Sequence, residues 1–251
     1  YILKTFDIHM SKKLGQNFLI DETVVNNIVN AAEIEEGETV LEIGPGIGTL
    51  TQALAEAKAN VIAVEIDNKL PAVLAKTLEG YDNVRIVHDD ILKVNIRELV
   101  EDKPFKVVAN LPYYITTPII MGILEQKLPV TRLVTMIQKE VADRMIAKPG
   151  KKDYGSLSVA VQYYTEPEIV ALVPPKSFIP SPAVDSVVIS CKVRPQPAVK
   201  VNSEKMFFTI AKGGFAQRRK TLSNSLKTTG IPADRIKGAL ESAGIDGNRR
   251  G

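Results

Sequence analysis

The stretch TVLEIGPGIG at residues 39–48 decides the fold of this chain. Its first half, residues 39–43, is a short apolar run of the kind that forms a buried strand. Glycines at 44, 46 and 48 then let the backbone turn and approach a ligand without a Cβ in the way. A helical stretch begins at Thr49, so the positive N-terminus of a helix faces the same loop. The stretch therefore predicts a ligand site at the carboxyl end of a strand.

The alternation of strand and helix continues after this stretch. Short apolar runs alternate with helical stretches, which is typical of a parallel sheet with right-handed crossovers and helices on both faces. We therefore expect an α/β fold built on a doubly wound, Rossmann-like sheet. The predicted strands are 39–43, 60–66, 84–88, 105–110 and 132–138, and the predicted helices between them are 49–57, 68–78 and 118–126.

The regions that flank this core give the domain organisation. Asp21 can N-cap a helix that runs to about Ala32. Four prolines within 174–182 predict an irregular loop between two further strands. Beyond about Val201 the pattern is helical. The further strands are predicted at 166–173 and 184–193, and the late helices at 204–213, 218–228 and 234–243. We therefore predict two domains. The first is 1–196, with a lead-in segment 1–20, and the second is a small all-helical domain at 197–251.

Composition restricts the class of protein. Hydrophobic residues make up 45% and charged residues 24% of the chain, as in soluble globular proteins. No apolar run reaches the roughly 18 residues of a membrane-spanning helix, so we expect no membrane partner. The single cysteine, Cys191, excludes an internal disulfide and is expected in the core, which favours a cytoplasmic location. The two histidines, His9 and His88, have no ligand-spaced neighbours, so no metal site is expected.

Positive charge is concentrated near the end of the chain. The net charge is only +3, but residues 205–227 hold six basic residues and no acidic one, and Arg249 and Arg250 follow. A solvated helix face usually mixes both signs, so a one-sign stretch favours a polyanionic partner.

The glycine loop can be compared with two kinds of nucleotide site. A dinucleotide site has the spacing Gly-x-Gly-x-x-Gly, and the position that this spacing requires is Thr49 here. The actual spacing, Gly-x-Gly-x-Gly after an acid, favours a methyltransferase, with a nucleotide-dependent oxidoreductase as the alternative. Glu65 ends the next strand, 21 residues after Gly44, where an acid can accept hydrogen bonds from the ribose hydroxyls of a cofactor. Asp89 and Asp90 follow the third strand and could accept from its adenine amine.

Asn110-Leu111-Pro112-Tyr113 follows the fourth strand and is the most specific motif in the chain. An amine on an adenine ring is a poor nucleophile because its lone pair is delocalised. If the Asn110 side-chain oxygen and the Leu111 carbonyl accept its two protons, the lone pair is freed toward a methyl group. Pro112 stiffens the turn, and the Tyr113 ring can stack on the base. The motif predicts methyl transfer to an adenine amine, and a base within folded RNA would first have to be flipped out.

Taken together, these motifs resemble the KsgA-type (RsmA) small-subunit rRNA adenine dimethyltransferases, and more distantly the erythromycin-resistance rRNA methyltransferases. The resemblance covers the chain from Lys12 to Gly251. It rests on the motifs LGQNFL at 14–19, EIGPG at 42–46, NLPY at 110–113, QKEV at 138–141, YGSLS at 154–158, FIPSP at 178–182 and FAQRRKTL at 215–222. Members of the family continue past residues 249–251 into a last helix, so we expect this chain to be shorter at that end.

The resemblance implies a class I methyltransferase sheet that binds S-adenosyl-L-methionine. Gln16, Asn17 and Leu19 would cover the methionine end of the cofactor, and Phe178 would sandwich the target adenine with Tyr113. The basic residues Arg218, Arg219 and Lys220, together with Arg249 and Arg250, would contact rRNA phosphates. The complete predicted cofactor set is Gln16, Asn17, Leu19, Gly44, Gly46, Glu65, Ile66, Asp90, Ile91 and Asn110, and the catalytic set is Asn110, Leu111, Pro112, Tyr113 and Phe178.

The implied activity is dimethylation of N6 on two adjacent adenines near the 3′ end of small-subunit (16S) rRNA, within an immature 30S particle, by a monomeric enzyme. Two alternatives remain open on the sequence. One is a large-subunit rRNA methyltransferase that confers macrolide resistance. The other is a ribosome-assembly factor that acts mainly through rRNA binding.

Overall fold

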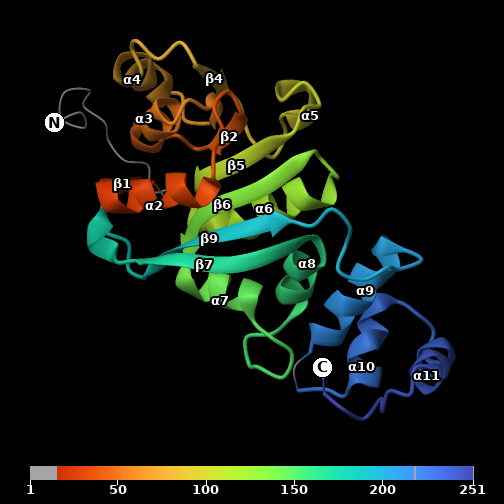
Figure 1. Ribbon diagram of the computed structural model, residues 1–251. Helices are drawn as coiled ribbons and strands as arrows, with labels where there is room; N and C mark the ends of the chain where they lie inside the picture. The colour runs from red at the N-terminus through yellow and green to blue at the C-terminus, as the bar shows by residue number, and fades with distance from the viewer. Residues whose placement is uncertain (1–15, 218, 251) are drawn as a thin grey trace.

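The computed structural model describes residues 16–217 and 219–250, and its centre is one seven-stranded sheet (Figure 1). The strand order is β4-β3-β2-β5-β6-β9-β7, in which the first five strands are parallel and β9 is antiparallel to both of its neighbours. The α/β doubly wound prediction is thereby confirmed. The strands are β2 (Thr39–Ile43), β3 (Asn60–Glu65), β4 (Val84–His88), β5 (Phe105–Asn110), β6 (Val130–Gln138), β7 (Thr165–Val173) and β9 (Ser186–Val193).

Side chains alternate between the two faces of the sheet, as the period of a strand requires. Val40, Val108 and Val134 pack on one face, and Leu41, Val107 and Leu133 on the other. Helices cover both faces, so the central parallel strands β2 and β5 are mostly buried, whereas β4 at the edge is only partly buried. The first face is covered by α2 (Glu22–Ala32) and α3 (Thr49–Glu56), the second by α5 (Ile96–Leu99), α6 (Thr116–Glu125), α7 (Lys139–Ile146) and α8 (Ser156–Tyr164), while α4 (Leu70–Thr77) packs beside β4.

Several predicted boundaries agree with the structure to within two residues, and other regions differ, among them the short helix α5, which was not predicted. Residues 174–182 are not wholly irregular, because β8 (Phe178–Ile179) pairs there with β1 (Phe18–Leu19) in a second, two-stranded sheet. The helices α7 and α8 were not predicted. The helix predicted at 218–228 is only α10 (Leu222–Leu226), because Thr221 is its N-cap and its side chain accepts from the Asn224 amide.

The last helices form a group beside the sheet, at the blue end of the chain in Figure 1. They are α9 (Glu204–Phe215), α10 and α11 (Ala233–Ser242). An aromatic cluster joins α9 to α8, in which Tyr163 contacts both Phe207 and Phe208 at ring-centroid distances of 5.0 and 5.2 Å. The boundary at residues 196 and 197 stays a prediction, although the sheet ends at Val193 and the next helix begins at Glu204.

Two features of the sequence have plain structural counterparts. Cys191 is buried in the core, as expected. In the part of the chain that the structure describes, no helix has both the length and the apolar character to cross a membrane.

Substituting Gly213 tests the packing of the C-terminal helices. A Cβ on Gly213 would lie 2.3 Å from Thr229 Cγ2, so Gly213→Ala should cost about 1–3 kcal/mol through overpacking. Gly238 of α11 has open space around its Cβ position, and Gly238→Ala should instead stabilise its helix by up to about 1 kcal/mol. Urea unfolding of both variants checks this, and equal stabilities would contradict the packing of α9.

Candidate active site

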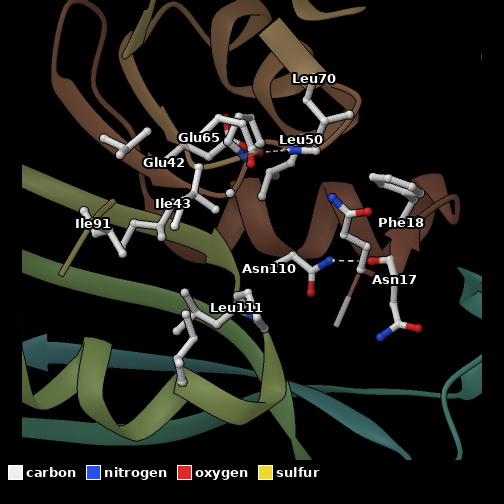
Figure 2. Close-up of a pocket in the computed structure, with 18 of the residues that line it drawn as sticks. Asn17, Phe18, Glu42, Ile43, Leu50, Glu65, Leu70, Ile91, Asn110 and Leu111 are labelled. Carbon is white, nitrogen blue, oxygen red and sulfur yellow. Dashed lines mark hydrogen bonds between the residues drawn. The ribbon is translucent and has the colours of Figure 1, made fainter. Parts of the chain in front are cut away.

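A pocket lies at the carboxyl ends of β2, β3, β4 and β5 (Figure 2). The chain runs from β2 toward β4 on one side and resumes at β5 on the other, so the pocket sits at the switch point where such sheets bind ligands. The pocket is open to solvent on one side, and apolar and acidic side chains line it. The predicted residues that line it are Gln16, Asn17, Leu19, Gly44, Gly46, Glu65, Ile66, Asp90, Ile91, Asn110, Leu111, Pro112 and Tyr113.

The glycine loop adopts the backbone that its sequence predicts. Gly44, Gly46 and Gly48 have φ values of +68°, +62° and +93°, which only glycine adopts without strain. A Cβ on Gly46 would lie 3.1 Å from the ring of Phe18, so Gly46 lets the segment before α2 close over the loop. A Cβ on Gly44 would meet nothing within 4 Å, and this residue lines the pocket. The loop therefore leaves open space where a ligand can approach the backbone.

Glu65 is fixed at the end of β3 by two backbone amides. Gly46 N donates to its Oε2 at 3.3 Å, and Asp67 N donates to its Oε1 at 2.8 Å. Burial raises the pKa of Glu65, and the two amide hydrogen bonds oppose that shift. The carboxylate is thus held between the glycine loop and the start of the next loop, a position that suits a ribose-binding acid.

Glu42 is a pocket residue that the predicted site set did not include. It is 1% exposed, and its Oε2 has no hydrogen-bond partner among the described residues. Burial raises the pKa of Glu42 to about 8, the Thr51 hydroxyl opposes the shift, and the charge of Glu65 adds to it. The only sequence signal for Glu42 was its place as the acid before the glycines, which periodicity alone does not distinguish from a strand residue.

The turn after β5 is held by the segment that covers it. Asn110 Nδ2 donates to the Asn17 carbonyl at 3.0 Å, which Figure 2 shows as a dashed line. With the amide nitrogen committed, the Asn110 Oδ1 and the Leu111 carbonyl make no hydrogen bond to the described residues and line the pocket. Pro112 O accepts from the Thr116 hydroxyl, which ties the turn to α6. The arrangement leaves two acceptors available to one ligand amine.

Two aromatic residues near this turn lie in different surroundings. Tyr113 lines the pocket, and its hydroxyl is 2.7 Å from Ser186 Oγ; burial raises its pKa. Phe178 does not line the pocket. It is buried among Leu19 and Val173 because β8 pairs with β1. The structure therefore does not bring Phe178 beside Tyr113, and its stacking on a base stays a prediction that requires the ring to leave this packing.

The acids after β4 and the segment before α2 complete the pocket. Asp90 Oδ1 accepts from the Leu92 amide, and its Oδ2 lies 3.4 Å from Lys93 Nζ. Gln16 Nε2 donates to Asp67 at 2.7 Å. Sequence spacing predicted only a helix lead-in at 16–19, whereas the structure pairs Phe18 and Leu19 with β8 and places them against the pocket.

Of the predicted RNA-binding residues, Arg219 and Lys220 lie in the turn between α9 and α10, and Arg249 and Arg250 lie after α11, none of them in the pocket lining. An isolated bridge joins Thr221 to Arg250, and Leu222 N donates to the Arg249 carbonyl, so residues 249–250 lie against the segment that follows Lys220. Arg219, Lys220, Arg249 and Arg250 are all exposed. Arg218 lies outside the described residues.

The residues present fit a nucleoside cofactor with a cationic centre. The buried Glu42 Oε2 has no hydrogen-bond partner among the described residues, and a Cβ on Gly44 would meet only open space. Glu65 is held where it could accept hydrogen bonds from ribose hydroxyls. The described residues contain no cluster of three or more His, Cys, Asp or Glu side chains that could hold a metal ion.

Comparison with known proteins agrees with this geometry. The family model described as ribosomal RNA adenine dimethylase matches residues 8–250. Proteins named ribosomal RNA small subunit methyltransferase A from Alkaliphilus metalliredigens and Clostridioides difficile are each 51% identical over the whole chain, which spans 89% and 88% of their lengths. A dimethyladenosine transferase from Plasmodium falciparum has a TM-score of 0.78 at 27% identity, covering 92% of this chain and 91% of that one. The 23S rRNA methyltransferase ErmE has a TM-score of 0.71 at 30% identity, covering 92% of each chain.

The buried carboxyl of Glu42 predicts a pH-dependent stability. Its pKa is about 8 in the folded protein against 4.5 for an ordinary Glu, so folding favours the protonated form. The stability that this provides is complete below pH 4.5 and is lost as the pH rises to 8, by up to about 1.4 kcal/mol per pH unit. Glu42→Gln should therefore unfold at a higher urea concentration than the wild type at pH 8, and the difference should shrink at pH 5.

The control for that measurement is Glu22→Gln, which removes an exposed carboxylate at the start of α2. It should keep the wild-type slope of stability against pH. A Glu42→Gln variant with the same slope as the wild type would refute the neutral, buried form of Glu42.

Proposed function

Since the chain belongs to the ribosomal RNA adenine dimethylase family, we propose that its substrate is small-subunit rRNA and that it dimethylates N6 of two adjacent adenines near the 3′ end of that RNA. The enzyme is an S-adenosylmethionine-dependent rRNA adenine methyltransferase. The observation that carries the proposal is the turn at 110–113, whose residues line one pocket beside the glycine loop while Asn110 Nδ2 donates to the Asn17 carbonyl.

The proposed chemistry is positioning of an amine. The hydrogen bond to the Asn17 carbonyl supports this role for Asn110, because it orients the side chain with Oδ1 available. Oδ1 and the Leu111 carbonyl would accept the two amine protons and free the nitrogen lone pair. When bound, the cofactor supplies a methyl carbon activated by a positively charged sulfur, so the protein needs orientation more than a strong base. The methylated nitrogen would give up its proton to solvent, while the Asn110 Oδ1 accepts a hydrogen bond without taking the proton.

Recognition of the base would use the aromatic residues of this edge. Tyr113 lines the pocket and offers a ring face to a flipped adenine. Phe178 would complete a sandwich only after its ring turns out from its contact with Leu19. We propose that this movement accompanies entry of the base.

The choice of subunit follows from the relatives. The proteins named for the small subunit are 51% identical to this chain, whereas ErmE, named for 23S rRNA, is 30% identical. This difference favours the small subunit over the large-subunit alternative. We further propose that the target is an immature 30S particle in the cytoplasm, approached by a monomer. Methylation of 30S but not 50S particles with labelled cofactor would support the assignment.

We propose that RNA affinity comes from the exposed basic residues in the segments that join and follow the C-terminal helices. Arg219 and Lys220 lie near Arg249 and Arg250 because of the bridge between Thr221 and Arg250. Contacts of this kind neutralise phosphates and set salt dependence rather than base identity. Their place outside the pocket also favours a second candidate function, ribosome assembly through rRNA binding alone.

Asn110→Ala tests the catalytic proposal and separates the two functions. Loss of the acceptor should lower methyl transfer at least about 100-fold, the loss typical of removing one preorganised polar group, while binding of the cofactor changes far less. Asn60→Ala, at the opposite end of the sheet, is the control and should remain active. Transfer at the wild-type rate by Asn110→Ala would end the assigned role, and retained particle binding without transfer would support the assembly function.

The double variant Arg219→Ala/Lys220→Ala tests the RNA surface. Removing two phosphate contacts should reduce the slope of log affinity against log salt by about 1.5 for unmethylated small-subunit rRNA. Lys58→Ala/Lys76→Ala removes two exposed lysines elsewhere and should leave the slope unchanged. Equal slopes for the two double variants would show that Arg219 and Lys220 do not contact the RNA phosphates.

A further inference from the structure

The pocket has an unbalanced charge. The ionisable residues that line it, within the described part of the chain, are four acids and two tyrosines, with no lysine, arginine or histidine. The four acids are Glu42, Glu65, Asp89 and Asp90. A partly enclosed site of one sign favours a ligand of the opposite sign, because a low-dielectric surrounding strengthens the attraction. The pocket therefore favours a positively charged ligand.

Glu42 differs from the other three acids in that no backbone amide or basic side chain among the described residues is bonded to its carboxyl group. Both Glu65 oxygens accept hydrogen bonds from backbone amides, and Asp89 accepts one from the Asp90 amide. Asp90 accepts a hydrogen bond from the Leu92 amide and forms an ion pair with Lys93. Glu42 is buried deepest, and its Oε2 is unmatched. A lone buried carboxylate is costly, so the group is neutral until a positive charge arrives.

Among residues 16–217 and 219–250, the elements around Glu42 provide no such charge. Glu65 faces it from β3 and is itself acidic. Thr51 contributes a hydroxyl from α3, and the part of α3 beside the pocket, residues 49–55, carries no ionisable side chain. Residues 43–48 of the glycine loop carry none, and the adjoining strand β5 pairs Val108 with Glu42. Asp89 and Asp90, from the loop after β4, are again acidic.

We propose that Glu42 is a charge-selective positioning residue, which is protonated in the free protein and gives its proton to solvent when the cationic methyl donor binds. This rests on the proposed function only in taking a sulfonium compound as the ligand. S-adenosylmethionine carries a sulfonium, an ammonium and a carboxylate, so its net charge is +1. S-adenosylhomocysteine has a neutral sulfur and a net charge of zero.

The consequence is discrimination between donor and product. The donor carries one positive charge more than the product, so it compensates an ionised Glu42 more strongly, and Glu42 favours the donor in the occupied pocket. Transfer of the methyl group removes the positive charge from sulfur, after which Glu42 regains a proton from solvent. A pKa of about 8 for the Glu42 carboxyl agrees with this order of events at neutral pH.

Calorimetry of the wild-type protein tests the proposal without any RNA. Binding heats for each ligand are measured at pH 6.5 in two buffers of different ionisation enthalpy, and the difference gives the protons released. Glu42 is then protonated in the free protein. We expect close to one proton released per S-adenosylmethionine and close to none per S-adenosylhomocysteine. Donor affinity should also tighten by up to about tenfold from pH 6.5 to 7.5, while product affinity should not.

Two variants assign the proton. Glu42→Gln should bind the donor with no proton release and a smaller preference over the product. Asp89→Asn removes another acid from the same pocket, one that is exposed, and should retain the release. Donor binding by the wild type without proton release overturns the inference and leaves the methyltransferase assignment intact. Proton release that persists in Glu42→Gln also overturns it, because another group would then be the source.

Discussion

The pocket depends on the parallel register of β4, β3, β2 and β5. Because these strands run in one direction, the loops that follow them meet at one edge, and Glu42, Glu65, Asp90 and Asn110 surround one space although they are far apart in the sequence. The antiparallel strand β9 contributes differently. Its first residue, Ser186, reaches the Tyr113 hydroxyl from the side. One register therefore positions both the glycine loop and the acceptor turn.

A second constraint joins the two halves of the site. The hydrogen bond between Asn110 and the Asn17 carbonyl connects the acceptor turn to the segment that covers the glycine loop. That segment is fixed in turn by the pairing of Phe18 and Leu19 with β8, which carries Phe178. The residues proposed to hold the cofactor and those proposed to hold the base thus belong to one connected unit. A shift of β8 on base entry would act directly on the cofactor cover.

The sequence predicted what depends on local pattern. Strand and helix periods gave the sheet, and the spacings of the glycines and of the motif at 110–113 gave most of the pocket. The strands β1 and β8 were not predicted, because a two-residue strand is too short to show an alternating pattern. Each is a strand only because it pairs with the other. The helix predicted from residue 218 failed because a capping threonine at 221 outweighs general helix propensity. The buried state of Glu42 was also hidden, since burial of a polar residue is a property of the packed sheet.

The contrast between Glu42 and the other buried charges of the sheet indicates why an uncompensated acid is retained. Lys106 is also largely buried, but it is paired with Glu38 at 2.7 Å, and Arg132 is paired with Glu33 at 2.6 Å. The fold therefore pairs a buried charged side chain with one of opposite charge where the residue has only a structural role. Glu42 has no such partner among the described residues, and a glutamine or an apolar residue at this position would destabilise the free protein less. An uncompensated buried carboxyl in the pocket, in a sheet where Lys106 and Arg132 are both paired with acids, is what a site that binds a cation should show.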